Sequence, residues 1–278
     1  MDFLSNISSI SKISTCSLSS GSSGNSILIK SDSTCVLIDA GISARSTASS
    51  LATFGIDIAL LDAIFITHEH IDHIKGLRVI SNKYKIPVYM MWESFNKLNE
   101  DYKFYMSEVI NFISPQESVV IGDLIIECYL TPHDSAASIG YIVKQGSHKF
   151  VGIATDIGCV TDDMTAALSG CKIVYIESNH DLEMLRTSSY PDNLKRRIKS
   201  KEGHLSNIDC AKILPQLIKN GTKKILLYHL SNENNTREIA FAESRKSILE
   251  AKLNVGTIFL GVAPQYEPSQ LLEINTEA

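Results

Sequence analysis

In this 278-residue chain, an apolar segment of strand length runs directly into a dense cluster of histidines and carboxylates. Residues 61–67, LDAIFIT, predict a buried strand, and the next six residues, HEHIDH, hold four potential metal ligands. In extended chain His68 and His70 point to the same side and can hold one cation. Asp72 and His73 follow at the turn where we expect a helix to begin, and they suit a second cation. Imidazole and carboxylate together favour Zn²⁺ or Mn²⁺.

The alternative for this cluster is a polar loop whose histidines only cap the following helix. Because four potential ligands fall within six residues at the end of a strand, the spacing favours the metal site.

Apolar segments of strand length recur along the chain. Pairs of them predict β-hairpins over residues 26–30 with 35–39, 118–121 with 124–130, and 139–144 with 149–154. A further strand is expected at 86–90, and helices are expected at 43–54 and 74–84. Helical and strand segments then alternate over 161–168, 173–177, 181–185, 192–200, 207–219, 224–228, 235–251 and 257–260. This order indicates one α/β domain over residues 13–278, after a flexible polar tail over residues 1–12.

The composition excludes several classes of protein. Hydrophobic residues make up 44% of the chain and charged residues 21%, which argues against disorder, collagen and coiled coil. No apolar run approaches the roughly 18 residues that cross a bilayer, and the first dozen residues do not resemble a signal peptide. We therefore expect no membrane association. The six cysteines form no CxxC pair, which favours free thiols in the cytoplasm.

Several motifs together resemble one known family. THEHIDHIKG resembles the HxHxDH signature of metallo-β-lactamase-fold hydrolases. SLSSGSSGNS, LIDAG, TPHDS, ATDIG, ESNHD, YPDNLKRRI, GHLSN and HLSNENN accompany it, in the order typical of the YycJ/WalJ branch, which is related to ribonuclease Z and ribonuclease J. The resemblance covers roughly residues 13–262. It implies an αββα sandwich of two mixed sheets flanked by helices, with the metals at one edge between the sheets.

The resemblance also implies the rest of a two-metal site. His133 in TPHDS would join His68 and His70 on the first metal. His229 in HLSNENN would join Asp72 and His73 on the second metal, and Asp156 in ATDIG would bridge the two ions. The alternatives for these three distant residues are a capped turn or a histidine satisfied in the core.

Two further histidines receive separate interpretations. GHLSN resembles the His-Ser-Thr segment of ribonuclease Z, so His204 is the candidate for stabilising developing charge or assisting the leaving group. Its alternative is a structural histidine ahead of a helix capped by Ser206. His180 in ESNHD is expected to face the substrate or to support the ligands, and a purely structural role remains the alternative.

Two segments have the composition of phosphate-binding elements. In the small-residue loop 19–25, SSGSSGN, backbone amides and hydroxyl groups can approach an anion at Ser22, Gly24 and Asn25. The alternative for this loop is an ordinary turn. In the basic stretch 192–201, DNLKRRIKSK, the candidates for holding a polyanionic backbone are Lys195, Arg196 and Arg197. The alternative for this stretch is a solvated helix face.

The expected chemistry is hydrolysis assisted by two metal ions. Two cations about 3.5–4 Å apart can hold a bridging hydroxide, which would attack phosphorus in line. Asp72 would accept the proton of the hydroxide and His204 would assist the leaving oxygen. By resemblance we expect a 5′-to-3′ exonuclease acting on DNA more than on RNA. The alternatives are a hydrolase of a cyclic phosphodiester, thioester or lactone, and a non-catalytic metal-binding regulatory protein.

The net charge of the chain is −5, which by itself disfavours a nucleic-acid partner. Two divalent cations would add about four positive charges, and Asp72 and Asp156 would face those cations. The charge balance is therefore compatible with an enzyme that holds a strand end at one metal-loaded edge. The sequence contains no signal for an oligomeric state.

Overall fold

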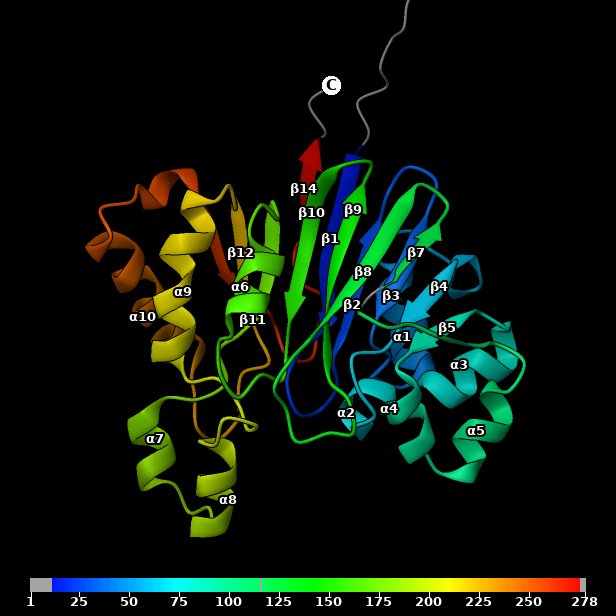
Figure 1. The fold of residues 1–278 in the computed structure, drawn as a ribbon, viewed down its shortest axis with the longest axis horizontal. Coiled ribbons are helices and arrows are strands. Elements are labelled where there is room, and N and C mark those ends of the chain that lie inside the picture. Colours follow the sequence, from blue (N-terminus) through cyan, green and yellow to red (C-terminus); the bar gives the residue numbers. More distant parts are fainter. Residues whose placement is uncertain (1–11, 116, 276–278) are drawn as a thin grey trace, which may run out of the picture.

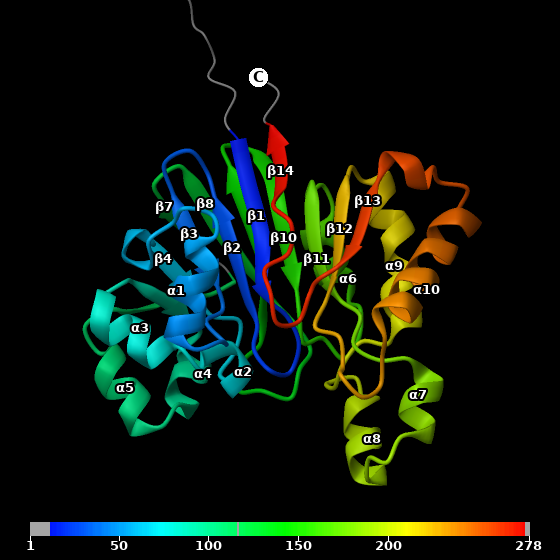
Figure 2. The same ribbon diagram turned by 180° about the vertical axis from the view of Figure 1, so that it is seen from behind.

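The computed structural model describes residues 12–115 and 117–275, in which two seven-stranded sheets pack face to face and helices cover their outer faces (Figures 1 and 2). In spatial order, the first sheet consists of β14 (Leu272–Asn275), β1 (Lys12–Ser19), β2 (Ser26–Lys30), β3 (Cys35–Ile38), β4 (Ala63–Phe65), β5 (Val88–Met90) and β6 (Ile110–Phe112). The second sheet consists of β13 (Phe259–Val262), β12 (Lys224–Tyr228), β11 (Ile173–Glu177), β10 (His148–Ala154), β9 (Ile139–Gln145), β8 (Leu124–Leu130) and β7 (Ser118–Ile121).

Both sheets are mixed and follow the same plan. Strands β14, β1, β2 and β3 are antiparallel, and β3 to β6 are parallel. In the second sheet β7 to β10 are antiparallel and β10 to β13 are parallel. Parallel neighbours need longer crossovers than antiparallel ones, and in both sheets the helices occupy these crossovers.

The helices form the two outer layers. On the first sheet these are α1 (Ala44–Ala52), α2 (Ile71–Ile74), α3 (Leu77–Tyr84), α4 (Trp92–Lys97) and α5 (Glu100–Met106), with a 3₁₀ turn at Ile58–Leu60. The remaining helices are α6 (Asp162–Leu168), α7 (Leu182–Thr187), α8 (Asp192–Ile198), α9 (Asn207–Lys219) and α10 (Arg237–Glu250), with a 3₁₀ turn at Val255–Thr257. No helix in the two described stretches is both long and apolar enough to cross a membrane.

Three apolar layers hold the sandwich together. Along β2, Ile27 and Ile29 point into the layer between the two sheets, whereas Leu28 points into the layer beneath the helices of the first sheet. Val151 and Ile153 of β10 contribute to the central layer from the other sheet. Because successive side chains of a strand face opposite sides, strands buried on both faces are continuously apolar. The αββα sandwich predicted from the sequence is confirmed.

The predicted hairpins are all present, but β1 was not expected. The predicted tail over residues 1–12 lies outside the described residues except for Lys12, which begins β1. The sequence of this strand, KISTCSLS, contains many serine and threonine residues, and these interrupt the apolar pattern by which a buried strand is predicted. Thr15 is fully buried, and its hydroxyl donates to the carbonyl of Leu28 at 2.6 Å and lies 3.0 Å from the hydroxyl of Tyr175. Hydrogen bonding allows these polar groups to be buried in a strand.

Other elements also differ from the sequence prediction. The strands β6 and β14 and the helices α4 and α5 were not predicted. The helix expected over 74–84 is divided, because α2 begins inside the HEHIDH motif and ends before Gly76. A side chain at Gly76 would lie 2.2 Å from the carbonyl oxygen of Ile42, so only glycine permits this close packing.

The predicted ligands lie at one end of the sandwich. β4, β10 and β12 all end there, and the short helix α2 and the helices α7 and α8 lie at the same end (Figure 1). β1 begins and β14 ends at the opposite end of the sandwich (Figure 1). The carboxyl ends of parallel strands are therefore the surface on which the candidate site is built.

Candidate metal centre

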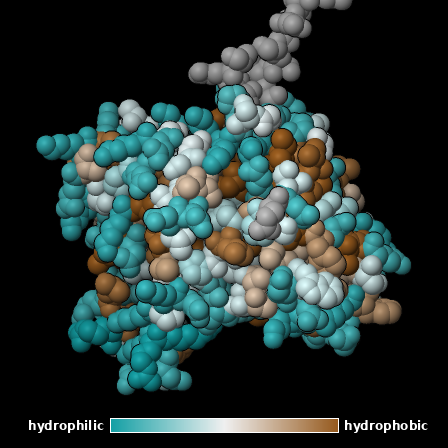
Figure 3. All heavy atoms as spheres, viewed as in Figure 1, coloured by the Kyte–Doolittle hydropathy of each residue, from teal (hydrophilic) through white to brown (hydrophobic). Residues whose placement is uncertain are grey.

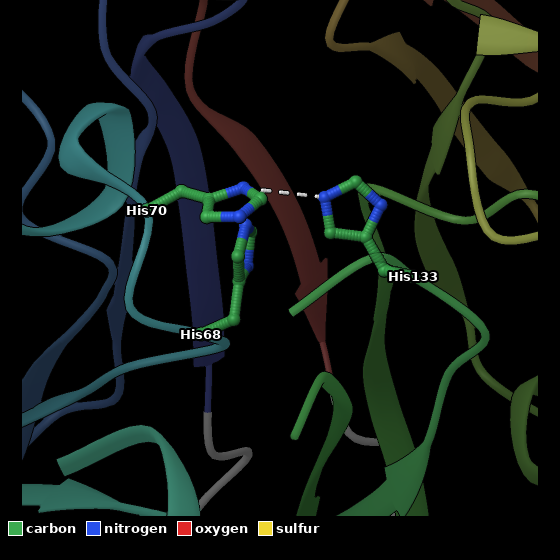
Figure 4. A group of neighbouring side chains, drawn as sticks. All are labelled: His68, His70 and His133. Carbon is green, nitrogen blue, oxygen red and sulfur yellow. Dashed lines mark hydrogen bonds between the residues drawn. The ribbon is translucent and has the colours of Figure 1, made fainter. Parts of the chain in front are cut away.

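Three histidines from two different loops converge to form the first group of ligands. His68 and His70 follow β4, and His133 comes from the opposite side, in the loop between β8 and β9 (Figure 4). Nε2 of His133 lies 3.3 Å from Nδ1 of His70. Their potential ligand atoms lie within 4.8 Å of one another. The structure thus brings together the three histidines that were predicted to share one metal ion.

The first group fits a metal ion. Nitrogen atoms that bind Zn²⁺ at 2.0–2.1 Å with tetrahedral angles lie about 3.3–3.4 Å apart, close to the separation of His70 and His133. Nε2 of His68 is buried and has no hydrogen-bond partner among the residues that the structure describes. An unsatisfied buried nitrogen is costly in free energy, and coordination of a cation would satisfy it.

The second group is formed by Asp72, His73 and His229. Oδ2 of Asp72 lies 3.5 Å from Nε2 of His73 and 3.4 Å from Nε2 of His229. Asp72 and His73 belong to α2, and His229 directly follows β12 on the other sheet. The ligand atoms of this group also lie within 4.8 Å of one another. A carboxylate and two imidazoles form a donor set that suits Zn²⁺ or a similar first-row metal.

The carboxylate of Asp156 lies between the two groups. One of its oxygens, Oδ2, is 3.1 Å from Nε2 of His73 in the second group. The other oxygen, Oδ1, is 3.9 Å from Nε2 of His133 in the first group. This side chain is almost completely buried. Oδ1 also lies 3.5 Å from Nδ1 of His229 in the second group. The carboxylate therefore reaches residues of both ligand groups, which is the position that a bridging carboxylate would occupy.

Three residues of the centre share an unusual backbone conformation. Asp39, Asp156 and His229 have φ angles of 63°, 52° and 55°. Few residues other than glycine adopt this left-handed region, and aspartate is among those that tolerate it best. Each follows a strand closely, so the left-handed residue turns the chain sharply where its side chain must face the site. Such strain concentrates at functional sites.

Asp39 and Thr67 orient the ligand histidines from behind. Oδ2 of Asp39 lies 2.7 Å from Nδ1 of His73, and the hydroxyl of Thr67 donates to the same carboxylate at 3.0 Å. The Thr67 hydroxyl has only one proton, and this proton is donated to Asp39. The N–H group at Nδ1 of His68, 3.1 Å from the hydroxyl oxygen, therefore donates to that oxygen. Nε2 of His68 then keeps its lone pair and faces the centre. Asp39 in LIDAG was not assigned a role from the sequence, although its place after an apolar strand could have indicated one.

Glu177 is the second buried carboxylate that the sequence reasoning missed. It is the last residue of β11, and Oε1 lies 2.7 Å from Nδ1 of His204 and 3.1 Å from Nδ1 of His229. Its other oxygen accepts hydrogen bonds from the backbone N–H groups of Ile157 and Leu205. A glutamate that ends an otherwise apolar strand is rarely buried without a specific partner. The place of Glu177 in the sequence could therefore have indicated a role in the site.

His204 lies at the open side of the centre. Its ring centroid is 5.2 Å from that of His133 and 5.3 Å from that of His229, so it is close to both groups. Because Glu177 holds Nδ1, Nε2 is the ring nitrogen that remains for a substrate. The side chain is 17% exposed, whereas Glu177 is fully buried.

The carboxylates make the centre favourable for positive charge. Burial by itself opposes protonation of His229, but Asp156, Asp72 and Glu177 raise its pKa to about 10. Burial lowers the pKa of His68 well below its ordinary value, so this ring is neutral. A neutral imidazole with a free lone pair, in a site where carboxylates favour positive charge, is an arrangement that binds a divalent cation.

The loop 19–25 packs against the ligands. Asn25 is fully buried, and its amide Nδ2 lies 3.2 Å from Oδ2 of Asp72 and 3.1 Å from Nε2 of His73. Its backbone N–H donates to the carbonyl of Asp72. Asn25 thus holds the side chain of Asp72 in position, whereas the sequence predicted that Asn25 would contact the substrate. Gly24 is buried in the same loop, and Ser22 is exposed.

His180 is buried close to the start of α9. Its carbonyl accepts a hydrogen bond from the N–H of Asn207, and its backbone forms an isolated parallel bridge with Ser206. Nδ1 of the ring is buried and finds no hydrogen-bond partner within residues 12–115 and 117–275, and burial lowers the pKa of the ring to about 4. The packing supports the structural alternative for this residue, and a contact with substrate stays a prediction.

The basic helix α8 lies at the ligand end of the sandwich, but its cations have different environments. Nζ of Lys195 donates to the carbonyls of Arg186 and Ser188, which fastens α8 to the end of α7. Arg197 forms a bidentate ion pair with Asp134, next to His133. Arg196 is exposed. Hydrophilic side chains dominate the surface over α8, at the lower left of Figure 3.

Comparison with known proteins agrees with the fold and the site. A family model described as "Beta-lactamase superfamily domain" matches residues 34–230, which include every ligand of both groups. Together with the αββα sandwich and the histidine and aspartate centre, this match defines the class: the chain belongs to the β-lactamase superfamily and is a metal-dependent hydrolase.

Within the superfamily, the chain belongs to the YycJ/WalJ branch. "Exodeoxyribonuclease YycJ" of Bacillus anthracis is 35% identical over 235 residues, which cover 84% of this chain and 89% of that protein. "Exodeoxyribonuclease WalJ" of Streptococcus pneumoniae serotype 2 is 38% identical over 239 residues, covering 84% and 88%. The crystal structure of the metallo-β-lactamase-fold protein YhfI from Bacillus subtilis superposes with a TM-score of 0.67 at 16% identity, covering 94% of this chain and 99% of that one. This structural likeness shows the fold alone.

Proposed function

We propose that the protein is a dinuclear phosphodiesterase that removes nucleotides from DNA ends in the 5′-to-3′ direction. The observation that supports two ions most directly is the carboxylate of Asp156, whose oxygens face both ligand groups. The names of the two relatives, both exodeoxyribonucleases at 35–38% identity, support DNA as the substrate.

The donor set would divide between two ions as the family resemblance implies. His68, His70 and His133 would hold the first ion, and Asp72, His73 and His229 would hold the second, with Asp156 shared. Two bound ions of Zn²⁺ or Mn²⁺ would lower the pKa of a water molecule and neutralise charge on the phosphate. The remaining chemistry belongs to the side chains of the chain itself.

Asp72 and His204 are the candidates for moving protons. The carboxylate of Asp72 is fixed by Asn25 and is still 18% exposed, so it can accept a proton from an attacking water molecule. On the other side, Glu177 stabilises the doubly protonated ring of His204, so that Nε2–H can donate to the departing oxygen.

The phosphate backbone of a longer substrate would pass α8. Arg196 is exposed there and can contact phosphate directly. Lys195 and Arg197 add to the local positive potential and, through their hydrogen bonds, hold α8 in place beside His133. Such charge contacts bind a backbone without reading its sequence.

The thiol chemistry supports a reducing compartment. All six cysteines are free, and five of them are buried. We infer that the protein works in the cytoplasm, where free thiols persist.

A substrate panel tests the proposal. The protein is loaded with Mn²⁺ or Zn²⁺ and incubated with labelled duplex DNA, single-stranded DNA, RNA, bis-p-nitrophenyl phosphate and a thioester. We expect mononucleotides to be released from the 5′ end of DNA and the simple phosphodiester to be cleaved more slowly. Turnover of the thioester alone would instead establish a small-molecule hydrolase. Metal content far below two ions per chain, in protein prepared without chelators, would contradict the dinuclear site.

A further inference from the structure

An aromatic cluster belongs to helix α4 and strand β6, and α4 lies beside α2, at the ligand end of the sandwich and on the side away from α8 (Figures 1 and 2). It consists of Trp92, Phe95 and Phe112, defined by ring-centroid distances of 5.1 Å for Trp92 and Phe112, 5.5 Å for Phe95 and Phe112, and 6.0 Å for Trp92 and Phe95. Trp92 is 54% exposed and Phe112 is 45% exposed. Large aromatic rings that stay half exposed next to one another are a feature of binding surfaces.

The cluster lies at the same edge of the first sheet as the ligands. Trp92 directly begins α4 after β5, and Phe112 ends β6. Since β4, β5 and β6 are parallel, their carboxyl ends reach the same edge. Phe65 of β4 pairs with Tyr89 of β5, and His68 and Trp92 each follow three residues later. Trp92 therefore lies at the position after β5 that corresponds to the position of the candidate ligand His68 after β4.

One short loop joins the cluster to the metal centre. The hydroxyl of Ser94 in α4 donates to the carbonyl of Ala137 at 2.7 Å. The N–H of the preceding residue, Ala136, donates to Oε1 of Glu69 at 2.8 Å, next to His68. This loop also carries His133. The aromatic cluster and the first ligand group therefore share a rigid, hydrogen-bonded support.

The size of the cluster argues against a subunit interface as its main purpose. A completely covered aromatic side chain buries about 150–250 Å². The exposed parts of three such side chains fall short of the roughly 800 Å² per partner that a stable interface needs. Three rings at the edge of a hydrolytic site match the scale of one or two nucleobases instead.

We propose that Trp92 and Phe112 form a stacking site for unpaired nucleobases of the strand whose end lies at the metal centre. This inference rests on the proposed function and names the form of its substrate. Bases expose their faces only when they are unpaired, so the site selects single strands or frayed ends. Stacking accepts any base, in keeping with an enzyme that degrades DNA of any sequence.

The single tryptophan of the chain provides a direct test, because all indole emission comes from Trp92. The metal-loaded protein is titrated with an oligothymidylate whose phosphorothioate linkages resist cleavage. A matched oligonucleotide of equal length and charge, built from abasic sites, serves as the comparison. We expect the thymine oligonucleotide to quench the emission of Trp92 and the abasic one to bind without comparable quenching. Fluorescence anisotropy of end-labelled oligonucleotides measures binding independently.

Variants separate stacking from folding. Phe112→Ala should weaken binding of the oligothymidylate roughly tenfold, and it should weaken binding of the abasic oligonucleotide much less. Phe104→Ala is the matched control, because Phe104 is 73% exposed on α5 and contacts Tyr105 in place of the cluster. This control should bind both oligonucleotides like the unmodified protein. Circular dichroism checks that each variant is folded.

The outcomes distinguish this inference from the proposed function. If DNA is bound and degraded but both oligonucleotides change the emission of Trp92 equally, the stacking site is refuted and the nuclease remains. If neither oligonucleotide binds and no DNA is degraded, the proposed function fails and the inference fails with it. If the emission instead depends on protein concentration and sedimentation shows a dimer, a second copy covers the cluster and the inference is overturned.

Discussion

Glu177 and His204 form a hydrogen-bonded pair beside the metal centre, with Oε1 of the buried Glu177 2.7 Å from Nδ1 of the partly exposed His204. The same carboxylate oxygen lies 3.1 Å from Nδ1 of His229, so one side chain supports both a ligand and the proposed acid. Backbone N–H groups of Ile157 and Leu205 hold the other oxygen. The carboxylate is thus fixed before any substrate arrives, which is the preorganisation that a proton donor requires.

The first prediction concerns His204 as the proton donor. His204→Ala should reduce the rate of DNA cleavage by roughly 10²–10⁴-fold, the usual contribution of general acid catalysis. The loss should be much smaller with bis-p-nitrophenyl phosphate, since p-nitrophenolate departs without a proton. Steady-state kinetics on the two substrates measure the difference. His148→Ala, at an exposed histidine of β10, is the control. Equal losses on both substrates would show that His204 only supports the structure.

The second prediction concerns Asp156 as the shared ligand. Asp156→Asn should abolish hydrolysis and lower the metal content from about two ions per chain to one or fewer. Asparagine tolerates the left-handed conformation at this position, so the fold should persist. Elemental analysis and circular dichroism measure the two effects. Asp163→Asn on the exposed side of α6 is the control. Retention of both ions and of activity would refute the bridging role.

The third prediction concerns the basic helix. Arg196→Ala should weaken binding of single-stranded DNA and reduce the slope of log K against log salt concentration by about one. Titrations at several salt concentrations provide this slope. Arg245→Ala removes an exposed cation from α10 and should leave the slope unchanged. An unchanged slope for both variants would mean that α8 presents only a solvated face.

The fourth prediction concerns the thiols. Burial raises the pKa of Cys35 to about 11 and the pKa values of Cys16, Cys128 and Cys171 to about 12, and it also raises the pKa of Cys210. These groups stay protonated in the folded protein at pH 8, so a disulfide reagent should modify only the half-buried Cys159. Rapid modification of several thiols in the native protein would contradict this packing.

The same thiols determine a pH dependence of stability. An unfolded thiol loses its proton near pH 9, whereas the buried thiols keep theirs to about pH 11–12. The folded state therefore binds more protons above pH 9, and its free energy of unfolding should decrease from pH 9 to pH 11. Denaturant titrations at pH 8 and pH 10.5 measure this decrease. The pH dependence of the free energy of unfolding is followed in the unmodified protein, because replacing a buried cysteine such as Cys16 by serine also changes the packing.

The candidate metal ligands could be grouped from the sequence because each of them ends or follows an apolar segment of strand length. His68, His70, Asp72 and His73 are neighbours in the chain, so their proximity needs no tertiary information. His133, Asp156 and His229 each stand after a separate apolar strand, and the family resemblance related them to one another. The structure brings these residues to one edge.

The supporting residues could not be predicted in the same way. Asp39 and Glu177 also end strands, but a lone carboxylate after an apolar run has many possible roles. Asn25 and Lys195 were predicted to contact substrate, yet the structure turns Asn25 toward Asp72 and Lys195 toward the end of α7. The direction of a side chain depends on neighbours that are distant in sequence, and short-range patterns do not contain that information.

Local patterns were enough to predict an α/β fold and a centre of histidines and aspartates, since apolar periodicity and ligand spacing are properties of short segments of the chain. The packing of the folded chain was needed to show which carboxylates support which histidines and which basic side chains remain exposed. It also brought the aromatic rings of Trp92 and Phe112 together, with 5.1 Å between their centroids. These features depend on burial and hydrogen bonding between β4, β5, β11 and the loops beyond them, which arise only when distant segments pack together.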